Sequence, residues 1–191
     1  MIENIRRIAV EAGEAIMKTY DQRAEIETKE DDSPLTQADR AAHNSIVKAL
    51  GKLTPDIPVL SEESESITTE ERLGWKRFWL VDPLDGTKEF IKKSGQFTVN
   101  IALIENGEST LGVVLAPASD LEYFANRGGG AFKRLGQGEP VPIHVSEPDK
   151  ARLRIVASRD HAGPKVAAML EQLPDGKLVS MGSSLKFCLV A

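Results

Sequence analysis

Residues 77–90, RFWLVDPLDGTKEF, run from an apolar segment into two aspartates, a glycine and a threonine. The apolar residues predict a strand over 78–81, and Asp82 and Asp85 follow it three residues apart. Asp-Pro and Asp-Gly are common turn dipeptides, so one interpretation is a simple turn. The other is a shared cation, because carboxylate oxygens are the ligands that hard divalent cations prefer. This stretch alone leaves both interpretations open.

The neighbouring residues can serve a cation and a phosphate. Pro83 stiffens the turn, and the Leu84 carbonyl between the carboxylates offers a further oxygen ligand. Gly86 permits a tight bend, and Thr87 begins a predicted short helix whose free N–H groups favour a phosphate. Phosphatases with an aspartyl nucleophile carry D-x-D-G-T, with the aspartates at i and i+2. Here the interval is i to i+3 with a proline between, which excludes that class.

The segments around this stretch predict layered helices and sheets. Residues 1–20 and a segment beginning at Thr36 have apolar residues at helical spacing, and Asp39 can close a capping box with Thr36. Between them, the polar residues 22–33 predict a solvated loop or a short strand pair. Short apolar or alternating runs predict an antiparallel meander under the two helices, at 78–81, 97–104, 111–116, 121–125 and 131–134.

The pattern changes after residue 135. Residues 136–150 contain three prolines and predict a connecting segment between an N-terminal α+β metal-binding subdomain, 1–135, and a C-terminal α/β subdomain, 151–191. In the C-terminal subdomain we expect a strand at 153–157, a helix at 164–173, a strand at 178–181 and a helix opening at 182–184. The last helix still presents an apolar face at Ala191, which predicts that this subdomain is truncated.

Composition limits the classes of function. The chain has 191 residues and a net charge of −5, and no basic stripe, which argues against a nucleic acid polymer as partner. No apolar stretch approaches the roughly 20 residues that span a bilayer. The single cysteine, Cys188, fits a reducing cytoplasm. We therefore expect a cytoplasmic protein; peripheral association at the inner membrane and the oligomeric state are left open.

Several side chains have a structural interpretation beside the functional one. Asp39 serves the capping box, and Glu62 lies in an acidic run, 61–71, that is typical of a solvated surface. Cys188 lies on an apolar helix face and is expected in the core, not as a nucleophile. His161, just before a helix start, is a candidate ligand contact.

Four motifs in order decide between these interpretations. They are S-P-L-T-x-A-D at 33–39, P-V-L-S-E-E at 58–63, W-L-V-D-P-L-D-G-T-K-E-F at 79–90 and G-S-S-L-K-F-C at 182–188. Together they resemble the inositol monophosphatase superfamily, and most closely its 3′(2′),5′-bisphosphate nucleotidase branch. The resemblance implies an α/β fold like that of inositol monophosphatase and fructose-1,6-bisphosphatase, with alternating helix and sheet layers and an incomplete C-terminal part.

The resemblance also implies a role for each matching position. The complete family site holds two or three Mg²⁺ ions. The implied ligands in this chain are Glu62, Asp82, the Leu84 carbonyl and Asp85. Asp39 and Thr87 would orient and deprotonate the attacking water, with Glu62 contributing. Contacts to phosphate and nucleotide would come from Asp85, Gly86, Thr87, Ser158, His161, Gly182, Ser183 and Lys186, the last as a cation for a second phosphate.

The implied activity is Mg²⁺-dependent removal of the 3′-phosphate from 3′-phosphoadenosine 5′-phosphate, giving AMP and phosphate, as in sulfate assimilation. An inositol or sugar phosphatase of the same superfamily is one alternative. In this family a later aspartate, in a W-D-x-A-A-G motif, completes the metal site, whereas both tryptophans here, Trp75 and Trp79, come early. A second alternative is therefore a non-catalytic fragment that binds metal or nucleotide without turnover.

Overall fold

The computed structural model describes residues 1–20, 26–28, 34–64, 67–147, 153–158, 164–172 and 177–191. Its two long helices are α1 (Ile2–Tyr20) and α2 (Gln37–Leu53), as the sequence predicts. The short ones are α3 (Thr69–Leu73), α4 (Thr87–Ile91), the 3₁₀ helix η1 (Pro117–Ser119), α5 (Pro164–Glu171) and α6 (Leu185–Cys188). The helix predicted to begin at Thr87 is thus confirmed.

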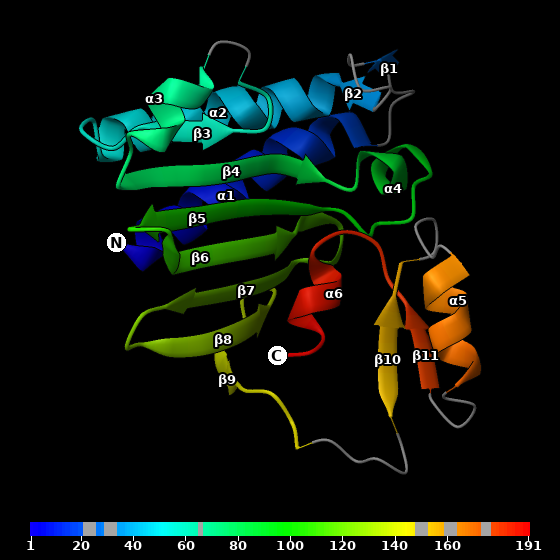
Figure 1. Ribbon diagram of the computed structural model, residues 1–191. Coiled ribbons are helices and arrows are strands. Elements are labelled where there is room, and N and C mark those ends of the chain that lie inside the picture. The colour runs from blue at the N-terminus through cyan, green and yellow to red at the C-terminus, as the bar shows by residue number, and fades with distance from the viewer. Residues whose placement is uncertain (21–25, 29–33, 65–66, 148–152, 159–163, 173–176) are drawn as a thin grey trace.

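A seven-stranded sheet forms the centre of the molecule (Figure 1). Its strands lie in the order β3 (Val59–Ser61), β4 (Arg77–Asp85), β5 (Thr98–Glu105), β6 (Glu108–Ala116), β7 (Leu121–Asn126), β8 (Gly130–Leu135) and β9 (Val141–Ile143). Neighbours from β4 to β9 pair antiparallel, which confirms the meander. β3 pairs parallel with β4 and forms an edge of the sheet.

The two faces of the sheet carry different layers. On β6, Val113 and Leu115 belong to the core shared with α1 and α2, because they point to the face that these helices cover. Val114 and Ala116 alternate with them and point to the opposite face. There Ala116 packs with Leu185 of α6, which lies in front of the sheet in Figure 1. The sheet therefore lies between the N-terminal helices and α6.

The remaining strands form two small pairs. β10 (Arg154–Ala157) and β11 (Lys177–Ser180) pair in parallel beside α5, and Figure 1 shows this group beside the main sheet. β1 (Ile26–Thr28) pairs antiparallel with β2 (Pro34–Thr36), in the region predicted as a loop or a strand pair. The predicted strand–helix–strand order of the C-terminal part is present.

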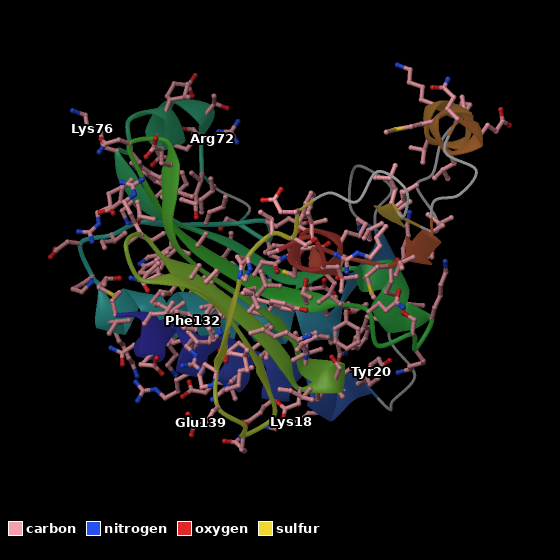
Figure 2. The ribbon with its side chains drawn as sticks, turned by 90° about the horizontal axis from the view of Figure 1, so that it is seen from below. Lys18, Tyr20, Arg72, Lys76, Phe132 and Glu139 are labelled. Atoms are coloured by element: carbon pink, nitrogen blue, oxygen red, sulfur yellow. The ribbon has the colours of Figure 1, made fainter. Side chains whose placement is uncertain are left out.

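Three features differ from the sequence-based expectation. β9 lies inside the predicted connecting segment 136–150, because the sheet continues beyond residue 135. β3 ends at Ser61, the first residue of the acidic run 61–71, and α3 overlaps the end of this run, where Thr68 and Glu71 form a capping box. Figure 2 labels Arg72 on this helix and Lys76 close to it, with Tyr20 on the other side of the view. Among the described residues, no helix is long and apolar enough to cross a membrane.

Candidate active site

A β-bulge aligns the two aspartates that end β4. Asp82 lies opposite Asn100 of β5, and Asp85 lies opposite Thr98, so three steps along β4 match two along β5. In a regular strand, residues three apart point to opposite faces of the sheet. The extra residue in the bulge cancels that reversal, and bulges commonly re-aim side chains in this way. Although Asp82 and Asp85 are three residues apart, they therefore point to the same face of the sheet.

Burial along β4 confirms the change of alternation. Trp79 and Val81 belong to the core under α1 and α2, and after the bulge it is Leu84 that does so. Asp82 and Asp85 are only half-buried and lie on the other side of the strand, toward α6. The bulge therefore anchors the strand end in the core while it presents two acids away from that core.

Negative charge accumulates around Asp82. Burial, then the charges of Glu62 and Asp85 and a hydrogen bond with Glu62, raise the pKa of Asp82 to about 8. Its Oδ1 atom is buried and has no hydrogen-bond partner among the described residues. Glu62 reaches this place because its backbone N–H donates to the Val81 carbonyl at 2.9 Å, where β3 ends beside β4. A cation bound beside these acids would favour their full ionisation.

Asp39 joins α2 to the end of β4. Its Oδ2 accepts hydrogen bonds from the backbone N–H of Thr36 at 2.8 Å and from the Thr36 hydroxyl at 2.5 Å, which confirms the capping box. Its Oδ1 accepts a bond of 3.2 Å from the Thr87 hydroxyl. Burial raises the pKa of Asp39, and the hydrogen bonds from Thr36 and Thr87 oppose that rise. Asp39 therefore serves both the helix cap and the residue at the start of α4.

The start of α4 has no side-chain cap. Gly86 occupies the N-cap with φ 94° and ψ 44°, a left-handed conformation that favours glycine. A Cβ at this position would lie 3.2 Å from the Gln96 carbonyl oxygen, so space also requires glycine. Because Gly86 has no side chain, the N-cap residue itself supplies no hydrogen bond to the first N–H groups of α4.

Asp85 is held by residues that the sequence analysis did not select. Its Oδ2 accepts hydrogen bonds from the Ser184 backbone N–H and, at 3.5 Å, from the Asn100 amide. The Ser184 hydroxyl donates to Asn100 Oδ1 at 2.9 Å and lies 2.9 Å from Thr98 Oγ1. The available signal was Asn100, a polar residue inside an apolar strand and opposite Asp82 in the register.

The segment 182–186 lies against the loop that follows α4. The Gly182 N–H donates to Gln96 Oε1 at 2.9 Å, and Ser183 is buried with φ 51°. Lys186 donates to the Ser183 carbonyl at 2.6 Å, so its ammonium group already has an acceptor within its own turn. Gly182 and Ser183 therefore lie close to α4, whereas the Lys186 ammonium group points to its own backbone.

The other predicted residues line two separate pockets. Glu62, Asp82 and Asn100 line one of ≈ 700 Å³, and Ser158 and Lys186 line another of ≈ 530 Å³. The second is largely apolar and lies among β10, α5 and α6. The structure brings Ser158 to Lys186, and both line a different pocket from Asp82. His161 lies outside the described residues.

The acids fit a divalent cation in charge and in donor type. Among the described residues, no three acidic, histidine or cysteine side chains form a ready-made metal group. One reason is that Asp85 Oδ2 is engaged by Ser184 and Asn100. Asp82 Oδ1 is buried with no partner among the described residues and the pKa of Asp82 is raised, and a nearby positive charge would relieve both. The donor set therefore fits, after rotation of Asp85.

Cys188 is confirmed as a packing residue. It packs beside the cluster of Ala116, Tyr123 and Leu185. Burial raises the pKa of its thiol to about 11. Because the thiolate is the nucleophilic form, this thiol is unsuited to nucleophilic catalysis.

Comparison with known proteins decides the family. The sequence profile of the inositol monophosphatase family matches residues 1–191, the whole chain. The chain belongs to the inositol monophosphatase family. It is 48% identical over 193 residues to the 3′(2′),5′-bisphosphate nucleotidase CysQ of Salmonella typhimurium and 46% identical to that of Escherichia coli K12. Each alignment covers 100% of this chain and 76% of the relative.

Solved structures of this family share the fold. A crystal structure of CysQ from Bacteroides thetaiotaomicron matches with a TM-score of 0.83 and 37% identity, over 100% of this chain and 75% of that one. The extragenic suppressor protein suhB of Bartonella henselae matches with a TM-score of 0.80 and 28% identity, over 98% and 73% of the two chains. The predicted inositol monophosphatase-like fold of helix and sheet layers is therefore confirmed.

Proposed function

We propose that this chain is a Mg²⁺-dependent 3′(2′),5′-bisphosphate nucleotidase that converts 3′-phosphoadenosine 5′-phosphate to AMP and phosphate in the cytoplasm. The relatives at 46–48% identity carry the name of that nucleotidase, which supports this substrate over an inositol or sugar phosphate. The observation that carries the chemistry is the junction at Thr87. Its hydroxyl bonds to Asp39, and it stands at the uncapped start of α4 directly after the bulged pair Asp82 and Asp85.

Each part of the site has a chemical role in this proposal. Glu62, Asp82, the Leu84 carbonyl and Asp85 are the oxygen donors for the cations. Divalent cations held there would supply charge that stabilises the phosphate transition state and would make a bound water more acidic. The N–H groups of Gly86 and Thr87 would bind oxygens of the departing phosphate.

Asp39 and Thr87 act on the attacking water. A threonine hydroxyl holds its own proton too tightly to act as a general base without help. Because Asp39 Oδ1 accepts the Thr87 proton, the lone pairs of Thr87 Oγ1 remain free to accept a hydrogen bond from water. The pair would thereby orient the water and take up its proton. Glu62, which directly follows the neighbouring strand β3, would contribute. No covalent phosphoenzyme is required.

Specificity for a nucleotide with two phosphates is assigned to the C-terminal segment. Gly182 and Ser183 are packed beside α4, where they would contact the nucleotide next to the scissile phosphate. Lys186 would release the Ser183 carbonyl and pair with the second phosphate, and Ser158 lines the same hollow. His161 completes the proposed set. Nothing among the described residues supports the peripheral association with the inner membrane that the sequence left open.

Phosphate release from two substrates tests this function. With Mg²⁺ present, we expect 3′-phosphoadenosine 5′-phosphate to be hydrolysed much faster than inositol 1-phosphate, and Asp82→Asn to abolish the reaction. A preference for inositol 1-phosphate would select the other enzyme class of the family. Binding of both metal and nucleotide with no release of phosphate would select the non-catalytic alternative.

A further inference from the structure

The face of α2 that carries Asp39 also carries His43, one helical turn later. Residues four apart lie on the same side of a helix, one above the other. Asp39 reaches Thr87 on the α4 side of the site. His43 reaches the other side, where its Nδ1 atom lies 2.8 Å from the Ser61 hydroxyl in a hydrogen bond between the two side chains. One face of α2 thus touches both sides of the candidate active site.

Ser61 stands at a weakly supported point of the sheet. It is the last residue of β3, which has only three residues and forms the edge of the sheet. An edge strand has a neighbour on one side only, so side-chain bonds contribute a large part of what fixes its end. Ser61 is buried, at 4% exposure, and the next residue is Glu62. Whatever fixes Ser61 also fixes the backbone from which the Glu62 carboxylate extends.

We propose that His43 is a positioning residue, which through Ser61 holds Glu62 beside Asp82, where the two carboxylates could share a divalent cation. This inference rests on the proposed function, because it takes Glu62 and Asp82 as cation ligands. The two carboxyl groups share a hydrogen bond, and once both are ionised their like charges repel each other. The backbone bond from the Glu62 N–H to the Val81 carbonyl ties the end of β3 to β4, but β3 has no neighbouring strand on its other side, so a second restraint must come from elsewhere. The hydrogen bond from α2, a long helix packed in the core, supplies that restraint.

Loss of this bond has a specific consequence. If the ligands are not held in place before the metal binds, the entropy cost of ordering them reduces the affinity for the metal. Substitution of a residue that orients a metal ligand typically costs about tenfold or more in metal affinity. The hydrogen bonds described for His43 and Ser61 do not involve the segment 182–186, so the affinity for the nucleotide measured at saturating metal should change little. A residue that only stabilised the fold would change thermal stability and would leave metal affinity unaltered.

Titration with Mn²⁺, followed by electron paramagnetic resonance of the free ion, measures the relevant affinity without catalysis. The variants are His43→Leu, Ser61→Ala, the double variant and His43→Asn, in which the Asn amide can replace Nδ1 as partner of Ser61. His144→Leu is the control, since His144 is an exposed histidine after β9. We expect roughly tenfold weaker binding for each single loss, the same loss and no more in the double variant, and recovery in His43→Asn.

The outcomes separate this inference from the function on which it rests. If the wild-type chain binds Mn²⁺ and Asp82→Asn abolishes binding, but His43→Leu binds as the wild type does, the positioning role is refuted and the metal site stands. Additive losses in the double variant would also overturn the proposal, because the two side chains would then act separately. If the wild-type chain binds no Mn²⁺, both the metal site and the role of His43 are wrong. Unfolding curves of the metal-free variants identify any that fail to fold, and Ser61→Ala then provides the test.

Discussion

The Asp82 carboxyl lies between two other acids, Glu62 and Asp85, and one of its oxygens is buried without a partner among the described residues. Such an arrangement disfavours the ionised form, and the pKa of about 8 expresses that cost. A structural acid would have a partner that lowers its pKa. An acid that awaits a cation has the opposite property, because the bound ion later provides the charge. The residue-scale chemistry therefore favours a ligand over a turn former.

Stability of the metal-free protein should fall as pH rises through the range that Asp82 controls. The folded pKa of about 8 lies above the ordinary value of 3.8, so the folded state binds the proton more tightly than the unfolded state between them. Stability is then greatest below about pH 4 for this group and decreases up to about pH 8. We expect a decrease in the unfolding temperature on the order of a few degrees, reversed by added Mg²⁺. In Asp82→Asn both the decrease and its reversal should be much smaller, whereas equal behaviour would refute this role.

Thr87 provides a second residue-scale test. Thr87→Val removes the hydroxyl bonded to Asp39 and should lower kcat by about 10² to 10⁴, the usual contribution of a positioned proton-transfer group. Thr87→Ser keeps the hydroxyl and should retain most of the activity. Steady-state phosphate release measures both. Similar kcat values for Val and Ser would show that the hydroxyl has no part in the reaction.

At the scale of elements, the site depends on how the segment 182–186 meets the loop after α4. A Cβ on Gly182 would lie 2.6 Å from Glu89 Cγ and 2.9 Å from the Gln96 carbonyl oxygen. The first neighbour is a movable side chain, but the second is backbone. The close approach therefore requires glycine at this position, and the two segments fit only without a side chain there.

Substitution of two glycines tests that contact. Gly182→Ala should destabilise the protein by about 1–3 kcal/mol, because the Gln96 backbone has to shift. Gly51→Ala is the control: Gly51 lies in α2 with nothing within 4 Å of the added Cβ, and it should stabilise by roughly 0.5–1 kcal/mol. Urea unfolding measures both changes. Equal effects of the two substitutions would mean that the close approach does not matter.

Sequence reasoning found elements whose signals are local. The cap at Thr36, the start of α4 at Thr87 and the meander turns all follow from neighbouring residues. The bulge was not foreseen, because Asp82 and Asp85 can be seen to share a side only once β5 is in register. α3 carried a recognisable signal in Thr68 and Glu71, which the acidic composition of the run obscured.

Long-range contacts explain the other differences. β9 contains a proline and too few residues for a clear pattern, and its pairing with β8 is what makes it a strand. The network of Asp85 with Ser184 joins residues 99 positions apart, and no local pattern predicts such a bond. The motifs identified most of the candidate site by resemblance, whereas its supporting contacts required the fold.

At the scale of the whole molecule, a buried ion cluster fastens α1 to the sheet. Glu122 of β7 is 1% exposed and accepts hydrogen bonds of 3.0–3.2 Å from Arg6 of α1. Arg134 Nε lies 3.0 Å from the same carboxylate. The Arg6 guanidinium also lies 3.9 Å from the centre of the Phe124 ring. The cluster fixes the helix layer on the sheet that carries the site.

Removal of the charge on Glu122 should destabilise the molecule strongly. Glu122→Gln leaves two arginines beside a neutral side chain, and a broken buried pair costs on the order of 3 kcal/mol. Glu11→Gln removes an exposed partner of Arg7 and should change stability by less than about 1 kcal/mol. Urea unfolding of the two variants should differ clearly, and a loss for Glu122→Gln as small as that for Glu11→Gln would contradict the role of the cluster.

Crystals soaked in Mn²⁺ and measured by anomalous diffraction test the central claim most directly, because the ion itself is located. We predict a peak within ligand distance of the Glu62 and Asp82 carboxylates and the Leu84 carbonyl, with Asp85 turned from Ser184 toward it. The peak should be lost in Asp82→Asn crystals treated identically. A wild-type map with no peak at these oxygens, or with Mn²⁺ bound only elsewhere, would contradict the assignment of the bulged Asp-Pro-Leu-Asp segment as the metal site.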